Sequence, residues 1–137
     1  MAGFGEWEAN GKSLNIESSP KTGPQLLEEA VKLHKEGQIT QAEKLYVQAI
    51  EAGFHHEIIF SNLGVIYKNT NRIIEAKETY KRAILSNPQF ADAYANLGSL
   101  LKEEGQLDHA LAATLKALEL KPDHPDALMN LGGIYQD

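Results

Sequence analysis

The sequence predicts an all-α protein, an α-solenoid of stacked helix-turn-helix units with about seven helices. Asn-Leu-Gly recurs at 62–64, 96–98 and 130–132, a constant offset of 34 residues. The same offset relates two sets of alanines and one pair of prolines: Ala42, Ala76 and Ala110; Ala49, Ala83 and Ala117; Pro88 and Pro122. Apolar residues recur at helical spacing between these positions. A fixed period of this size is typical of a repeat array, in which each unit packs on its neighbours.

Residues 1–22 precede this frame and differ from it. They are rich in Gly, Ser and Asn and show neither a helical nor a strand period, so we expect a flexible tail. The aromatic residues Phe4 and Trp7 leave two interpretations open. They belong to an ordinary tail, or they dock on a partner or on the array itself.

The first unit spans 23–56. Leucine, alanine and valine at helical spacing predict a first helix that ends near Gly37 and a second helix over about 39–52. Gly53 is suited to the left-handed position that ends a helix. Phe54 stands where the later units have proline, so we expect a turn of different shape there.

The units 57–90 and 91–124 repeat the same helix-turn-helix. Gly64 and Gly98 are small residues on the first helices, and they allow neighbouring helix axes to approach to about 8–10 Å. The proline near the end of each unit stops the second helix, because proline cannot continue it and disfavours helix in the preceding residue.

A half unit, 125–137, contains one further helix. It has apolar residues on the side where a second helix would pack: Leu128, Leu131, Ile134 and Tyr135. Repeat arrays normally end on a polar face. We therefore expect either that the native chain continues or that another molecule, such as a second copy in a homo-oligomer, covers this face.

The arrangement resembles the tetratricopeptide repeat over 23–137. The family's pattern of large and small residues is complete in the second unit: Phe60, Leu63, Gly64, Tyr67, Ala76, Tyr80, Ala83 and Pro88. The first unit departs from it, with Glu29-Ala30 where Leu-Gly is expected. The resemblance implies a right-handed superhelix. The later units are most similar to the arrays of O-linked N-acetylglucosamine transferases and related bacterial proteins.

In such arrays an asparagine two residues before the glycine lines the concave face, and the asparagines form a ladder that grips the backbone of an extended peptide. Asn62, Asn96 and Asn130 match it, with possible groove neighbours Ser61, Val65, Ala95 and Ser99. A side-chain amide offers two donors and one acceptor carbonyl, and each hydrogen bond contributes about 0.5–1.5 kcal/mol. The alternative is that these asparagines serve only the structure of the repeat.

Chaperone-binding members of the family use a clamp of lysine and asparagine that captures a C-terminal carboxylate. The flanking positions here are Leu27 and Val31, Ser61 and Val65, Ala95 and Ser99, Met129 and Gly133. None is basic, so we predict no carboxylate clamp. A charge-neutral groove would favour an extended peptide held by backbone contacts.

Composition and motifs argue against several other functions. The net charge of −6 provides no basic stripe for nucleic acid. No apolar run approaches the roughly 20 residues that span a bilayer, and no signal peptide is recognisable, so we expect no membrane association and a cytoplasmic location. Cysteine is absent, which excludes disulfides and thiolate metal sites.

No group of residues in the sequence predicts a metal site or a catalytic site. His55, His56, His109 and His124 lack a second ligand at helical spacing, and we expect them in solvated loops, with no metal and no cofactor. No nucleophile is paired with a base, so there are no catalytic candidates and the chain alone is not an enzyme. We predict a protein-interaction module that binds an extended peptide or partner segment. The alternatives are the N-terminal, substrate-recruiting part of a larger glycosyltransferase or sulfotransferase, and a self-associating scaffold.

Overall fold

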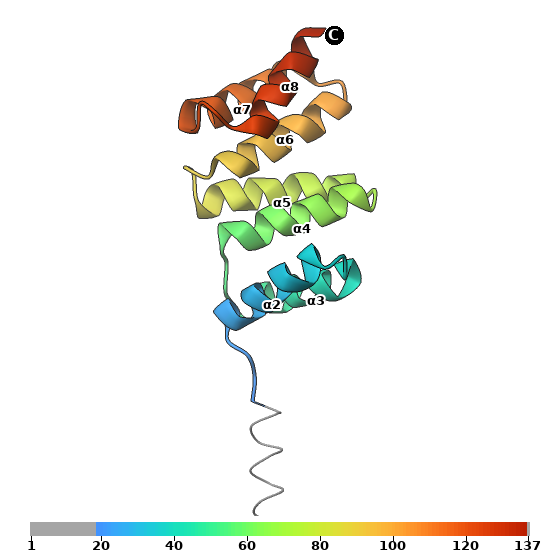
Figure 1. Cartoon of the computed structure of the whole chain (residues 1–137), viewed down its shortest axis with the longest axis vertical. Helices are drawn as coiled ribbons and strands as arrows, with labels where there is room; N and C mark the ends of the chain where they lie inside the picture. Colours follow the sequence, from blue (N-terminus) through green and yellow to red (C-terminus); the bar gives the residue numbers. More distant parts are fainter. Residues whose placement is uncertain (1–18, 137) are drawn as a thin grey trace, which may run out of the picture.

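A computed structural model describes residues 19–136, which form seven α-helices and no strand (Figure 1). The all-α prediction is confirmed. Phe4 and Trp7 lie outside the described residues. No helix in the described part of the chain is long and apolar enough to cross a membrane. The helices are α2 Gly23–Lys35, α3 Ile39–Glu51, α4 Glu57–Asn69, α5 Ile73–Ser86, α6 Ala91–Glu103, α7 Leu107–Leu120 and α8 Pro125–Gln136.

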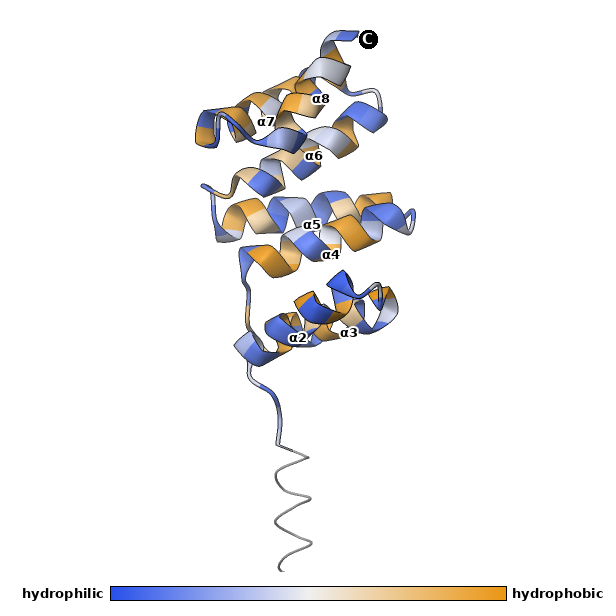
Figure 2. Cartoon of the chain, viewed as in Figure 1, coloured by the Kyte–Doolittle hydropathy of each residue, from blue (hydrophilic) through white to orange (hydrophobic). Residues whose placement is uncertain are grey.

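The helices pack as hairpins stacked along the long axis of the molecule (Figure 1). The pairs are α2 with α3, α4 with α5, and α6 with α7, and α8 packs on both α6 and α7. Apolar and polar residues alternate along each helix (Figure 2), so every helix buries one stripe and exposes another. The core is therefore divided into layers within and between hairpins, as expected for a repeat array.

The turn inside each hairpin needs one residue in the left-handed conformation. Gly37 and Gly105 occupy this position with φ of 82° and 79°, and Asn71 occupies it in the middle unit with φ of 62°. These three residues are 34 apart. Glycine has no steric penalty there, and asparagine is one of the few other residues that adopts this conformation routinely.

The small residues that recur every 34 positions have the packing reason that the sequence indicates. A Cβ atom on Gly64 would lie 2.4 Å from Cε1 of Tyr80, and one on Gly98 would lie 2.6 Å from Oγ1 of Thr114. Both distances are too short for a side chain. The first and second helices of each unit approach each other through these glycines.

The turn after the first unit differs from the later ones, as predicted from Phe54. Helix α3 ends with Gly53 at φ of 88°, and the Phe54 N–H donates to the carbonyl of Ala49 at 2.9 Å. The second helices of the later units instead end in extended residues, Asn87 and Lys121, directly before proline.

The apolar face of α8 is smaller than its sequence indicates. Ile134 is 7% exposed and packs against Leu101 and Ala110, so its assignment to a free surface is wrong. Helical rotation places it toward the preceding hairpin. Leu128 and Tyr135 are 49% and 71% exposed, and Leu131 is half-buried.

Candidate functional site: the groove across the first helices

A hollow of about 340 Å³ lies across the first helices of successive units. We call it the groove pocket. It is lined by residues of α4, α6 and α8, together with the residue that precedes α6: Ile58, Ser61, Asn62, Phe90, Asp92, Asn96 and Asp126. Two of the predicted ladder asparagines and one predicted neighbour therefore lie in the same hollow.

Asn62 and Asn96 each connect two units. The Nδ2 amide of Asn62 donates to the hydroxyl of Tyr46 at 3.1 Å, and that of Asn96 donates to Oγ of Ser61 at 3.0 Å. Each amide has two N–H donors and one carbonyl acceptor. Within the described residues, the second donor and the carbonyl oxygen of both amides form no hydrogen bond. Each asparagine thus supports the packing and retains polar groups that a peptide backbone could use.

A part-buried hydrogen-bond network connects Asn62 to Tyr46 of α3 and His34 of α2. The Tyr46 hydroxyl, which accepts from Asn62, also lies 3.2 Å from Nδ1 of His34. Burial raises the pKa of Tyr46 above 10.0, an effect that the hydrogen bond from Asn62 partly opposes, so the hydroxyl keeps its proton. Burial also lowers the pKa of His34, which favours the neutral imidazole, whose Nδ1 can accept a hydrogen bond from the Tyr46 hydroxyl.

The third ladder residue lies differently. Asn130 is 5% exposed, does not line the groove pocket, and donates through Nδ2 to the backbone carbonyl of Ala95 at 2.9 Å. Because α8 packs directly on α6, its asparagine is enclosed between these helices. A peptide contact by Asn130 stays a prediction.

The predicted groove neighbours also differ in environment. Ser61 lines the groove pocket although it is only 4% exposed. Ala95 is buried, and Val65 packs against the core cluster of Ala76, Tyr80 and Leu100. The hydroxyl of Ser99 accepts from Nζ of Lys68 at 3.3 Å, and neither residue lines the groove pocket.

The groove pocket is acidic, which corrects the expectation of a charge-neutral groove. Asp92 and Asp126, in the first turns of α6 and α8, both line it, and no basic residue of the described chain does. The positions that flank Asn62 and Asn96 are uncharged and so do not indicate this acidity. The aspartates stand one helical turn before Asn96 and Asn130, and this spacing puts them on the same helix face as the asparagines.

A buried histidine holds Asp92 in place. His124 is 3% exposed, and its Nε2 lies 2.6 Å from Oδ1 of Asp92. Its Nδ1 accepts the Ala127 N–H at 3.3 Å and so caps α8. Since Nδ1 is an acceptor, Nε2 carries the proton and donates to the carboxylate.

The expectation that His124 and His109 lie in solvated loops is therefore wrong. His109 lies on α7, exposed. His56, at the repeat position of His124, caps α4 by accepting the Ile58 N–H at 3.1 Å. This shared position, directly before a first helix, was the signal in the sequence. Among residues 19–136, no group of three possible metal ligands occurs.

Comparison with known proteins agrees with the helix packing. The tetratricopeptide repeat family matches residues 59–90 and 91–124. The chain carries tetratricopeptide repeats. Such repeats form extended concave surfaces that bind other molecules. No match was found among curated proteins.

Several solved structures share the fold at low sequence identity. The first TPR of Spaghetti (RPAP3), bound to the HSP90 peptide SRMEEVD, has a TM-score of 0.77 at 23% identity, over 84% of this chain and 91% of that chain. The Arabidopsis OM64 TPR domain has a TM-score of 0.78 at 18% identity, over 84% and 95%. MamA has a TM-score of 0.79 at 23% identity, over 91% and 72%.

Proposed function

We propose that this protein binds an extended segment of a partner protein in the groove pocket, with Asn62 and Asn96 contacting the backbone of that segment. The observation that carries the proposal is that both amides line one hollow across successive units and each keeps an unused donor and acceptor. Paired donors and acceptors match a peptide unit whatever its side chains. The affinity would therefore depend little on the partner's sequence at these contacts.

The charge of the groove pocket narrows the class of partner. Spaghetti is seen with the HSP90 peptide SRMEEVD, and the second TPR domain of human RPAP3 with the HSP70 peptide SGPTIEEVD. Both peptides end in acidic residues. Asp92 and Asp126 would repel such an end, because like charges destabilise a contact. We propose a neutral or basic partner segment in an internal, extended conformation.

The test uses neutral or basic peptides selected on the wild-type chain from a phage-displayed random library. Replacing Asn62 and Asn96 together by alanine should weaken binding at least about tenfold, which corresponds to about 1.4 kcal/mol. Gln41→Ala, which removes an exposed amide from α3, is the matched control. Because both asparagines also connect units, circular dichroism must show the double variant folded at the assay temperature. Unchanged affinity in the folded variant would contradict the proposal.

The exposed end of α8 supports a second candidate, self-association. Leu128, Met129 and Tyr135 are large, apolar and half or more exposed. We propose that they pack against a second copy. Light scattering over a dilution series should then show a dimer that dissociates in Leu128→Glu, and a monomer at every concentration would exclude it.

The resemblance to transferase arrays leads to a further proposal. We propose that residues 23–137 are the substrate-recruiting repeat array of a larger transferase, preceded by a tail over 1–22. It predicts that an antibody against the repeats detects a native polypeptide much larger than 15.1 kDa. A native band at that mass would argue for a stand-alone adaptor.

A further inference from the structure

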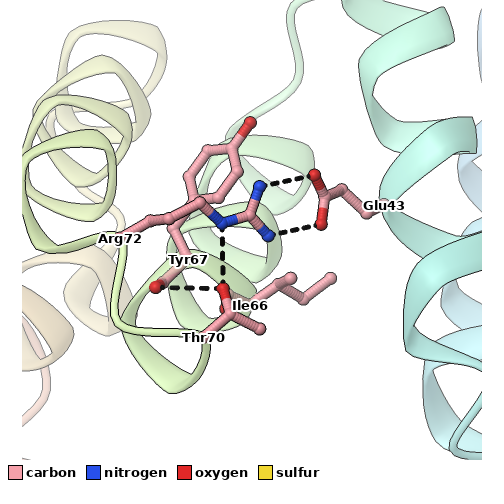
Figure 3. A network of polar contacts seen from close by, with 5 residues as sticks. All are labelled: Glu43, Ile66, Tyr67, Thr70 and Arg72. Atoms are coloured by element: carbon pink, nitrogen blue, oxygen red, sulfur yellow. Dashed lines mark hydrogen bonds and ion pairs between the residues drawn. The ribbon is translucent and has the colours of Figure 1, made fainter.

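The interface between the first and second units is closed by a polar cluster (Figure 3). The guanidinium of Arg72 donates to both carboxylate oxygens of Glu43, at 2.8 and 2.6 Å. It lies over the ring of Tyr67, 4.6 Å from the ring centroid, and its Nε donates to Thr70 at 3.0 Å. Glu43 comes from α3 and Tyr67 from α4, so the cluster joins two hairpins.

The same cluster cannot form at the next interface. The residues 34 positions after Glu43, Tyr67 and Arg72 are Lys77, Leu101 and Gln106. The carboxylate is replaced by an ammonium, the ring by a smaller leucine, and the guanidinium by an uncharged amide. Lys77 forms an ion pair with Glu104 at 2.8 Å instead.

A pocket of about 410 Å³ lies where the equivalent cluster would be. We call it the interface pocket. Its lining residues come from α5, α6, α7 and the turn before α7: Lys77, Lys81, Leu97, Leu101, Gln106, His109 and Ala113. It shares no lining residue with the groove pocket. Its volume is within the range of about 300–1,000 Å³ that is typical of ligand sites.

The lining of the interface pocket combines an apolar floor with a basic rim. Leu97, Leu101 and Ala113 supply the floor, and Lys77, Lys81 and His109 supply the nitrogen atoms. Lys81 is exposed and forms no ion pair with any residue in the described part of the chain. The pocket contains no carboxylate. An apolar group beside a negative charge is the complementary ligand, because it buries apolar area and pairs the free ammonium.

We propose that the interface pocket is a second binding site, which receives a large apolar side chain flanked by carboxylates in an acidic segment of a partner protein. Its chemistry is opposite to that of the acidic groove pocket. The two pockets can therefore bind two segments of opposite charge, from one partner or from two partners. The proposal does not depend on binding in the groove pocket.

The test titrates acetylated, amidated EEFEE into protein labelled with ¹³C at leucine and alanine methyl groups. We expect saturable NMR shifts at Leu97, Leu101 and Ala113 with a Kd of about 1 mM or lower. The peptides KKFKK and EEAEE should bind at least about tenfold more weakly, because the first reverses the charge and the second removes the apolar side chain.

Two protein variants complete the design. Lys81→Glu should weaken EEFEE binding about tenfold, whereas Lys44→Glu, an equal charge change on the exposed side of α3, should not. The triple replacement Lys77→Glu, Leu101→Tyr and Gln106→Arg transfers the closing cluster of the first interface. In folded protein it should abolish the shifts, and if it fails to fold, Lys81→Glu remains decisive.

Several results would overturn the proposal. These are no saturable shift at the three methyl-bearing residues, equal binding of KKFKK, unchanged binding by Lys81→Glu, or retained binding by the folded triple variant. Binding of 3-phenylpropionate as tight as that of EEFEE would also overturn it, because the ligand would then be a small acid and not a polypeptide segment.

Discussion

Thr114 is fully buried, and its hydroxyl is the one buried side-chain polar atom without a hydrogen-bond partner in the described residues. It stands at the repeat position of Tyr46 and Tyr80, and it packs over Gly98. An unsatisfied buried polar group costs about 1–3 kcal/mol. Valine has a similar shape without the hydroxyl. Thr114→Val should therefore raise the free energy of unfolding by about 1 kcal/mol, measured by urea denaturation.

Thr79 provides the matched control for this substitution. It is also buried, but its hydroxyl donates to the carbonyl of Glu75 at 2.6 Å. Thr79→Val removes a satisfied hydroxyl and should give no gain in stability. An equal gain in both variants, or none in Thr114→Val, would show that the Thr114 hydroxyl is not the source of the penalty.

Asn71 tests the backbone requirement of the hairpin turn. With φ of 62°, it has the conformation that costs an ordinary residue about 1–2 kcal/mol. Asn71→Ala should lower the free energy of unfolding by about 1 kcal/mol. Asn71→Gly should change it by only about a few tenths of a kcal/mol, since asparagine and glycine both tolerate the left-handed conformation. Thermal unfolding followed by circular dichroism checks both, and a harmless alanine would contradict this account of the turn.

At the residue scale, the sequence indicated which residues matter better than it indicated where the fold places them. It identified Asn62 and Asn96, and the glycines at the close helix contacts, because these recur with the period. It did not predict that Asn130 is enclosed, that His124 caps α8, or that Asp92 lines the groove pocket. Those facts depend on how far one hairpin is rotated on the next, and a repeat pattern does not specify that rotation.

At the scale of elements, the Glu43–Arg72 pair holds the first hairpin to the second. Hydrogen bonding to Arg72 lowers the pKa of Glu43 below its ordinary value of 4.5. A carboxylate with a lowered pKa in the folded state stabilises the protein above its unfolded pKa, and the contribution is lost as the pH falls through the folded pKa. The side chains are about one-quarter to one-third exposed, so the contribution is modest.

Glu43→Gln should therefore lower the free energy of unfolding at pH 7 by about 1 kcal/mol or less, and the difference from wild type should shrink as the pH falls below 4.5 and the carboxylate is protonated. Urea denaturation at each pH measures it. Glu78→Gln is the control, because Glu78 is exposed on α5 and forms no ion pair in the described residues. A difference that persists unchanged at low pH would contradict an electrostatic role.

The elements themselves follow closely from the sequence. The second helix of the first unit was predicted over about 39–52 and is α3, Ile39–Glu51. The altered turn at Phe54 was also foreseen, because glycine and proline act locally. The apolar face of α8 was predicted less well. Helical spacing places four residues on one side, but the preceding hairpin covers Ile134 and leaves Tyr135 exposed.

At the scale of the whole molecule, the units are similar in fold and different in surface. One interface is closed by Glu43, Tyr67 and Arg72, and the next has the interface pocket. The groove pocket lies across the first helices and is acidic. Since stability in such arrays is approximately a sum over units and their interfaces, surface residues can diverge between units without loss of the scaffold. Function therefore depends on these few differences.

The most direct test of the central claim is a map of peptide binding on the protein. A neutral or basic peptide selected from a random library, of the class proposed for the groove pocket, is titrated into ¹⁵N-labelled protein, and backbone amide shifts are followed by NMR. The account predicts that shifts concentrate on α4, α6 and the start of α8, around Asn62, Asp92 and Asn96, with little change on α5 and α7. Shifts centred on the second helices, with these residues unmoved, would contradict it.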